Sequence, residues 1–215
     1  INSMTKRTPV RDCGETIAPG ESARPFARSV VSDALSRASS VELQPSLDAV
    51  GTPAPSGHWI VVDLETTGLG AGAEITEIGA VRVRDGAVAD EFSSLVKPSR
   101  PIPPFITSLT GITPAMVADA DPIASVLERF MEWSGLGTED SPVLVAHNAS
   151  FDVGFLRRGA RASSLPWPRV RVVDTLALAR LALPRPLVRN HKLGTIASYF
   201  GTATVPEHRA LGDAR

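Results

Sequence analysis

The hydrophobic positions from residue 59 onward follow either the two-residue period of strands or the 3.6-residue period of helices. Residues 59–64 form a nearly continuous apolar run, which predicts a central strand buried on both faces. Residues 75–84 and 87–96 alternate between apolar and polar, and the Asp85-Gly86 pair between them is a favoured tight turn. This part of the chain therefore predicts three sequential strands, the last two joined as a hairpin.

Helical and strand patterns alternate in the rest of the chain. Residues 98–104 are a proline-rich break, and Asp121-Pro122 then opens a helix in which Asp121 serves as the N-cap. The elements expected after this helix are a strand, a helix, a strand and two helices, at residues 143–146, from 150, and at 170–173, 174–183 and 191–200. This order is that of the ribonuclease H-like fold, an α/β architecture with a mixed five-stranded sheet flanked by helices.

Residues 1–58 differ in composition from the rest of the chain. They are rich in Ser, Ala, Pro and Gly, contain few aromatic residues and show no sustained period. Such a segment buries too little apolar surface to offset its ordering entropy, so we expect a flexible, largely disordered extension. Only residues 28–43 show a helical pattern. The chain thus divides into an extension over 1–58 and a domain over 59–215.

Cysteine content and hydropathy indicate the cellular compartment in which the protein is expected. Cys13 is the single cysteine of the 215 residues, so no internal disulfide can form and a reducing cytoplasm is the expected location. No apolar run approaches the roughly 20 residues of a membrane span. We therefore expect a soluble cytoplasmic protein with no membrane partner.

The net charge of −1 conceals an uneven distribution of charge. Residues 59–153 contain 5 Lys and Arg against 14 Asp and Glu, whereas residues 154–215 contain 11 against 3. Such asymmetry points to contact with nucleic acid. The arginines that carry this expectation are Arg157, Arg158, Arg161, Arg169 and Arg171, although each alone is equally consistent with a solvated helix face.

Four carboxylates and one histidine, on three segments far apart in the sequence, are the candidates for catalysis. Asp63 and Glu65 leave the first predicted strand two positions apart, so both side chains point to one face and can reach the same ion. Asp152 starts a predicted helix, and His208 and Asp213 lie near the C-terminus. Hard divalent cations prefer oxygen ligands, so this set predicts a pair of cations and a base, as phosphodiester hydrolysis requires.

Each candidate also has a simpler structural interpretation. Taken alone, Asp63 and Glu65 would cap a turn, and Asp152 would only cap its helix. His208 in a polar loop would be exposed and idle, although Asp213 five residues later favours a site. His147 is interpreted as a structural, hydrogen-bonding histidine rather than a catalyst.

Three motifs resemble those of the DEDDh exonucleases, the family of the proofreading subunit of bacterial replicative DNA polymerase. They are Asp63-Leu64-Glu65-Thr66-Thr67-Gly68, His147-Asn148-Ala149-Ser150-Phe151-Asp152 and His208-Arg209-Ala210-Leu211-Gly212-Asp213. The motifs stand in the order of the family, and the resemblance covers about residues 59–215. It implies the same ribonuclease H-like fold and a 3′→5′ exonuclease that uses two Mg²⁺ or Mn²⁺ ions.

The resemblance also implies roles for single residues. It implies that the metal ligands are Asp63, Glu65, Asp152 and Asp213. His208 is the implied general base, because an imidazole accepts a proton from a metal-bound water near neutral pH. The residues implied to bind the terminal nucleotide are Thr66, Thr67, Gly68, Leu69, Asn148 and Phe151.

The expected substrate is single-stranded DNA or a frayed 3′ end, from which nucleoside 5′-monophosphates are released in proofreading or repair. An RNA 3′-exonuclease is the alternative within the class. A non-catalytic nucleic-acid-binding module of the same fold is the alternative outside it, and the intact carboxylate set argues against that. Residues 45–53 are similar to the lead-in of bacterial proteins that place a DEDDh domain before a GIY-YIG (UvrC-like) nuclease. A polymerase or a fused C-terminal nuclease domain is therefore the expected partner.

Domains of this family continue past the final Asp in a long helix that packs on the sheet. Only Ala214 and Arg215 follow Asp213 here, and a helix needs a full turn to nucleate. We therefore expect Asp213 to be poorly held in this chain, and the natural chain to continue beyond Arg215.

Overall fold

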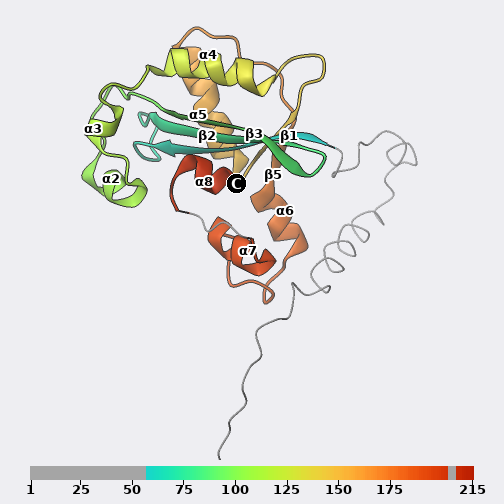
Figure 1. Ribbon diagram of the computed structural model, residues 1–215. Coiled ribbons are helices and arrows are strands. Elements are labelled where there is room, and N and C mark those ends of the chain that lie inside the picture. The colour runs from blue at the N-terminus through green and yellow to red at the C-terminus, as the bar shows by residue number, and fades with distance from the viewer. Residues whose placement is uncertain (1–56, 203–206) are drawn as a thin grey trace, which may run out of the picture.

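A five-stranded sheet forms the centre of the computed structural model, which describes residues 57–202 and 207–215 (Figure 1). Its strands are β1 (His58–Thr66), β2 (Ile75–Arg84), β3 (Ala87–Leu95), β4 (Val143–Ala146) and β5 (Val172–Asp174). They lie in the order β3-β2-β1-β4-β5. The β1–β2 and β2–β3 pairs are antiparallel, and the β1–β4 and β4–β5 pairs are parallel. The predicted α/β architecture with a mixed five-stranded sheet is confirmed.

Helices cover both faces of this sheet (Figure 1). On one face lie α4 (Ile123–Ser134) and α5 (Ala149–Ala162). On the other lie α6 (Thr175–Ala182), α7 (Leu193–Phe200) and α8 (Ala210–Ala214). The arrangement leaves the carboxyl end of β1 between the two helical layers.

The main hydrophobic core fills the space between the sheet and helices α4 and α5. Ile60, Val62 and Leu64 of β1 point into it and are at most 5% exposed. Phe130 of α4 and Leu156 of α5 belong to the same buried cluster. Since buried apolar area contributes about 25 cal/mol per Å², this face holds β1 and the residues at its end in place.

The opposite face of β1 is less buried than predicted. Burial alternates along the strand, so that Val61, Asp63 and Glu65 are only half-buried. The helices α6, α7 and α8 leave a cavity against this face, and Val61 and Asp63 line it. The prediction that β1 is buried on both faces is therefore wrong for the face that carries the candidate carboxylates.

The proline-rich region and the start of α4 also differ from the prediction. Two short helices that were not predicted, α2 (Pro104–Thr110) and α3 (Pro114–Val117), each place a proline in the first turn, where its missing N–H costs nothing. The prediction of Asp121 as N-cap is wrong, because Pro122 holds that position. Asp121 instead forms an ion pair with Arg129 at 2.9 Å.

The remaining boundaries agree with the prediction to within a few residues. β1 begins at His58, one residue before the predicted start of the domain. The helix predicted at residues 28–43 lies outside the described residues. Among the helices that the structure describes, none has the length and hydrophobicity to cross a bilayer.

Candidate active site

Asp63 and Glu65 stand where β1 ends, on the face that is not packed into the main core. The turn after β1 is closed by hydrogen bonds from Thr67 N–H to Glu74 O (2.8 Å) and from Glu74 N–H to Thr67 Oγ1 (2.9 Å). Gly68 has φ of 148° in this turn, a conformation that side-chain-bearing residues rarely adopt. Thr66, Thr67 and Gly68 therefore form the turn, and neither Asp63 nor Glu65 has a capping role within it.

Asp152 lies in the first turn of α5 and is 2% exposed. Its carboxylate accepts hydrogen bonds from its own backbone N–H and from that of Leu64 in β1. The N-cap of α5 is Asn148, which has φ of 73°. The interpretation of Asp152 as a cap alone is thus wrong: the side chain turns inward, toward the end of β1.

His208 and Asp213 reach the same place from the C-terminal segment. Glu65, His208 and Asp213 each offer one ligand atom, and these atoms lie within 4.8 Å of one another. The Asp213 carboxylate also accepts a hydrogen bond from the Glu207 N–H at 2.8 Å. The structure therefore brings together residues from β1, α5 and α8, and we call Asp63, Glu65, Asp152 and Asp213 the acidic cluster.

Glu77 is a buried residue of the site that the sequence reasoning missed. It lies opposite Glu65 in the β1–β2 pair and is 2% exposed. Its carboxylate accepts hydrogen bonds from Arg209 Nε (3.0 Å), Arg209 Nη2 (2.6 Å) and the Ala210 N–H (3.0 Å). A charged residue in the middle of a strand that is otherwise buried was the signal for it. Glu77 anchors the start of α8 to β2.

A close backbone approach completes this anchor. A Cβ atom built on Gly79 of β2 would stand 2.1 Å from the Leu211 N and 2.2 Å from the Ala210 carbonyl carbon. Only glycine allows α8 to lie so near the strand. Arg215 then pairs with Glu91 of β3 through bonds of 2.8 and 2.6 Å. The expectation that Asp213 would be poorly held is wrong, because residues before and after it fix α8 on the sheet.

Burial raises the pKa values of three members of the acidic cluster. Burial raises the pKa of Asp63 to about 9, and the nearby carboxylates of Asp152, Glu65 and Asp213 add to this rise. Burial also raises the pKa of Glu65 to about 8, against the opposing effect of Arg209. The pKa of Asp152 rises to about 7 because of burial, despite its backbone hydrogen bonds. A set of desolvated oxygen donors of this kind fits divalent cations, whose charge would stabilise the ionised forms.

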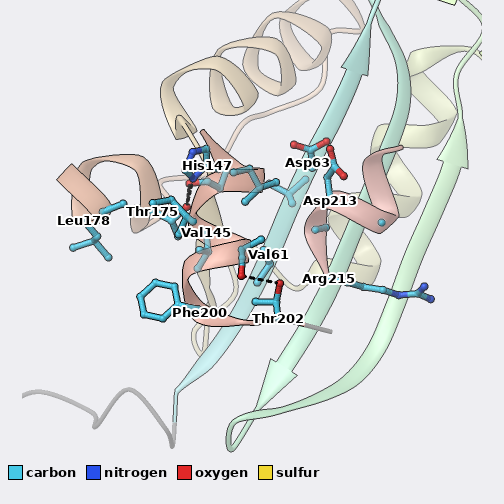
Figure 2. A pocket seen from close by; sticks show the side chains of 18 of the residues that line it. Val61, Asp63, Val145, His147, Thr175, Leu178, Phe200, Thr202, Asp213 and Arg215 are labelled. Atoms are coloured by element: carbon cyan, nitrogen blue, oxygen red, sulfur yellow. Dashed lines mark hydrogen bonds between the residues drawn. The ribbon is translucent and has the colours of Figure 1, made fainter. Parts of the chain in front are cut away.

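Asp63 and Asp213 lie at one end of a cavity of about 380 Å³ (Figure 2). Its remaining walls are largely apolar and include Val61, Leu178 and Phe200. An apolar wall beside a carboxylate removes water that would otherwise solvate the charge. Asp63 and Asp213 therefore form a polar end of an otherwise largely apolar cavity.

The residues implied for nucleotide binding differ in how exposed they are. Leu69 is 86% exposed, whereas Thr66 is buried and donates a hydrogen bond to Gly68 O at 2.8 Å. Phe151 packs on Phe155 with ring centroids 4.7 Å apart. Asn148 Oδ1 accepts a hydrogen bond from Ser150 Oγ at 3.3 Å. Leu69 is thus the member of the group most open to a ligand.

His147 has the structural role that was predicted for it. Its Nε2 lies 2.8 Å from the His191 carbonyl oxygen and its Nδ1 lies 3.0 Å from Thr175 Oγ1. His191 in turn bonds the Leu183 carbonyl oxygen at 2.8 Å. These contacts tie the end of β4 to the segments around α6 and α7.

The sequence and fold match known nucleases. The model of the RNase T exonuclease family matches residues 60–215. A Mycobacterium tuberculosis protein, named provisionally as a bifunctional exonuclease/endonuclease, is 51% identical over 164 residues, which are 73% of this chain and 25% of that protein. DNA polymerase III of the PolC type from Listeria monocytogenes is 41% identical over 157 residues, covering 73% of this chain and 10% of the polymerase. The chain thus spans a quarter or less of these curated relatives.

Two solved structures show the same fold. Exonuclease X, in complex with duplex DNA carrying a 5′ overhang, has 32% identity and a TM-score of 0.55, over 73% of this chain and 84% of that one. The nuclease domain of 3′hExo, a DEDDh family member bound to rAMP, has 22% identity and a TM-score of 0.64, over 76% of this chain and 88% of that one. The family match, with the acidic cluster at the end of β1, shows that this chain belongs to the RNase T exonuclease family, whose members are nucleases of the ribonuclease H-like fold.

Proposed function

We propose that this domain is a Mg²⁺- or Mn²⁺-dependent 3′→5′ exonuclease of the DEDDh type. It releases nucleoside 5′-monophosphates from single-stranded or frayed DNA. The observation that carries the proposal is the convergence of the acidic cluster and His208 at the end of β1, with the ligand atoms of Glu65, His208 and Asp213 within 4.8 Å of one another.

The acidic cluster is proposed to hold two divalent cations. Asp63 is proposed to be shared between them, and the support is that Asp152, Glu65 and Asp213 all lie near enough to raise its pKa in addition to burial. When bound, a pair of cations at such a site activates a water molecule and stabilises the leaving 3′-oxygen. The raised pKa values of Asp63, Glu65 and Asp152 fit this role, because a bound cation would stabilise the ionised form of carboxyl groups that burial otherwise keeps protonated.

His208 is proposed to be the general base. It is exposed, whereas the carboxylates beside it are wholly or partly buried, so it can pass its proton to solvent. Its backbone has φ of 57°, a left-handed conformation held by the Arg209–Glu77 anchor that follows directly. A proton acceptor positioned in this way contributes about 10²- to 10⁴-fold to a rate.

The turn after β1 and the start of α5 are proposed to bind the terminal nucleotide. The residues assigned to this role are Thr66, Thr67, Gly68, Leu69, Asn148 and Phe151. The exposed Leu69 offers an apolar surface to a base, and the φ of Gly68 keeps the turn open to a ligand.

DNA is proposed as the substrate in preference to RNA. The support is the 32% identity to Exonuclease X, a protein solved with DNA, and the 41% identity to a DNA polymerase III. Both curated relatives are much longer than this chain, so we also propose that the domain acts within a larger protein that carries a polymerase or a second nuclease activity.

The test is hydrolysis of 5′-labelled oligonucleotides, with and without a block at the 3′ end. With Mg²⁺ or Mn²⁺, a 5′-labelled DNA strand should shorten stepwise from its 3′ end, and a 3′-phosphorothioate block should stop the reaction. The same strand made of RNA should react more slowly. Shortening from the 5′ end, or equal rates with and without a divalent cation, would contradict the proposal.

A further inference from the structure

Five cationic side chains gather on the side of the molecule that carries α5. They come from the middle and end of α5 and from the loop after β3, and all five are exposed. They are Lys97, Arg100, Arg157, Arg158 and Arg161, which we call the basic groove.

The surface around these side chains is hollowed. One hollow, of about 590 Å³, is lined by Arg157, Arg158, Arg161 and Trp167 together with two other residues. A second, of about 680 Å³, is lined by residues that include Lys97, Arg100 and Arg158. Arg158 lines both, so the two hollows lie next to each other along α5.

The cations of the groove have no anionic partner among the residues that the structure describes. Elsewhere in that part of the chain Arg82, Arg129, Arg209 and Arg215 each form an ion pair. The carboxylate of Glu74 does line the second hollow, but it accepts hydrogen bonds from Ser99. Like charges held together without partners repel one another, so such a groove favours a polyanion.

The second hollow lies next to the loop that follows the catalytic end of β1. It includes residues 71–75, which continue directly from the turn that holds Gly68. Asp152 and Arg158 lie six positions apart on α5, or about 9 Å along the helix axis.

Aromatic side chains accompany the cations. The Arg158 guanidinium lies over the Phe155 ring, 4.0 Å from its centroid, and the half-buried Trp167 forms a wall of the first hollow. Because Phe155 is 3% exposed beneath Arg158, Trp167 is the aromatic side chain that can offer a stacking surface here. Cations beside such an aromatic surface are a combination found in proteins that bind single strands.

We propose that the basic groove binds the backbone of a single nucleic-acid strand on the 5′ side of the nucleotide held at the acidic cluster. The inference rests on the proposed function for the direction of the strand. It adds an extended binding surface outside the residues that contact the last nucleotide, and it predicts that long strands bind more tightly than short ones for electrostatic reasons.

The experiment compares a triple variant, Arg100→Ala/Arg157→Ala/Arg161→Ala, with a control of equal charge change, Arg84→Ala/Arg180→Ala/Arg189→Ala. The control arginines are exposed and lie outside the groove. Arg158 is retained because it packs on Phe155. Fluorescence anisotropy measures the Kd for trithymidylate and for an oligothymidylate of about 15 nucleotides at several salt concentrations, in an Asp63→Asn background that prevents hydrolysis.

For the long strand, the triple variant should bind at least about tenfold more weakly at low salt, and the slope of log K against log salt should become shallower by about 2, since each phosphate contact on a single strand contributes roughly 0.7. The Kd of the triple variant for trithymidylate should stay unchanged. A second protein carries the three substitutions but keeps Asp63, and it should hydrolyse trithymidylate at the native rate. A long-strand Kd and slope equal to those of the control would overturn the inference, and so would an equal loss for both strand lengths.

Two further readouts keep the test decisive. If the triple variant does not fold, the unaltered groove is tested by strand length alone, and equal salt slopes for the short and the long strand would refute it. If the protein with its native Asp63 hydrolyses neither strand, the proposed exonuclease activity fails, whereas the anisotropy measurements still decide whether the groove binds nucleic acid.

Discussion

Replacement of Glu77 by glutamine is predicted to slow catalysis without weakening substrate binding. The carboxylate is 2% exposed and accepts three hydrogen bonds, two from Arg209 and one from the Ala210 N–H. The amide keeps the size of the side chain but removes its charge, and its NH₂ group opposes one of the three donors. The start of α8 should therefore detach from β2 more often, and His208 and Asp213 would move with it.

The size of the effect follows from the burial of the pair. Removal of one partner from a fully buried ion pair costs about 3–5 kcal/mol. The Arg209 side chain is 42% exposed, so water replaces part of the lost interaction, and we expect a cost of about 2–3 kcal/mol from hydrogen bonds to a charged group. If α8 detaches locally, that cost corresponds to a fall in kcat of up to about 30- to 150-fold, at roughly 1.4 kcal/mol for each factor of ten.

The assay is the release of mononucleotides at saturating oligonucleotide, together with Mn²⁺ binding by calorimetry. The Glu77→Gln protein should show a lower kcat and weaker Mn²⁺ binding, with the Kd for a long oligonucleotide unchanged. Glu132→Gln, on the exposed face of α4, is the matched control and should behave like the unaltered protein. Native kcat and native Mn²⁺ affinity in Glu77→Gln would refute the reasoning that α8 depends on this residue.

Three further outcomes are expected. His208→Ala should lower the hydrolysis rate at neutral pH by about 10²- to 10⁴-fold and still bind the same number of Mn²⁺ ions in calorimetry; loss of an ion would make it a ligand instead of a base. Gly79→Ala should displace α8 and lower both melting temperature and activity, whereas Gly70→Ala, whose Cβ meets nothing within 4 Å, should not. The raised pKa values of Asp63 (about 9) and Asp152 (about 7) mean that the cation-free folded protein retains protons that the unfolded chain releases above about pH 4. Its melting temperature should therefore fall as pH rises from about 5 to about 9, and Mn²⁺ should reduce that fall; a pH-independent melting temperature would contradict the raised values.

The sequence predicted the elements whose signals are local. The strand at residues 75–84, the Asp85-Gly86 turn and the two-residue spacing of Asp63 and Glu65 each depend on neighbours along the chain, and the structure bears them out. The alternation expected for residues 75–84 is not seen in their burial, because β2 is buried on both faces from Ile75 to Val81. The order of the strands along the chain also followed from the pattern. The spacing positions two of the four members of the acidic cluster, Asp63 and Glu65.

What the sequence did not predict depends on contacts between distant segments. Glu77 stood out only as a charged residue in the middle of a strand, and its partner Arg209 lies 132 residues away along the chain. The formation of α8 was not predicted for the same reason, because nucleation rules describe an isolated helix and not one packed against Gly79. The helices α2 and α3 were missed because proline was interpreted only as a breaker, although it is favoured in a first turn.

The central claim is that the acidic cluster holds the cations that hydrolyse the 3′-terminal phosphodiester. The most direct measurement is the rate at which a 5′-labelled DNA strand is shortened by single nucleotides as Mn²⁺ is added. It compares the native sequence with Asp63→Asn and with Asp119→Asn, which alters an exposed carboxylate outside the cluster. The account predicts a saturable Mn²⁺ dependence that is lost in Asp63→Asn and retained in Asp119→Asn. Hydrolysis by Asp63→Asn at the native rate, or by the native protein in the presence of EDTA, would contradict it.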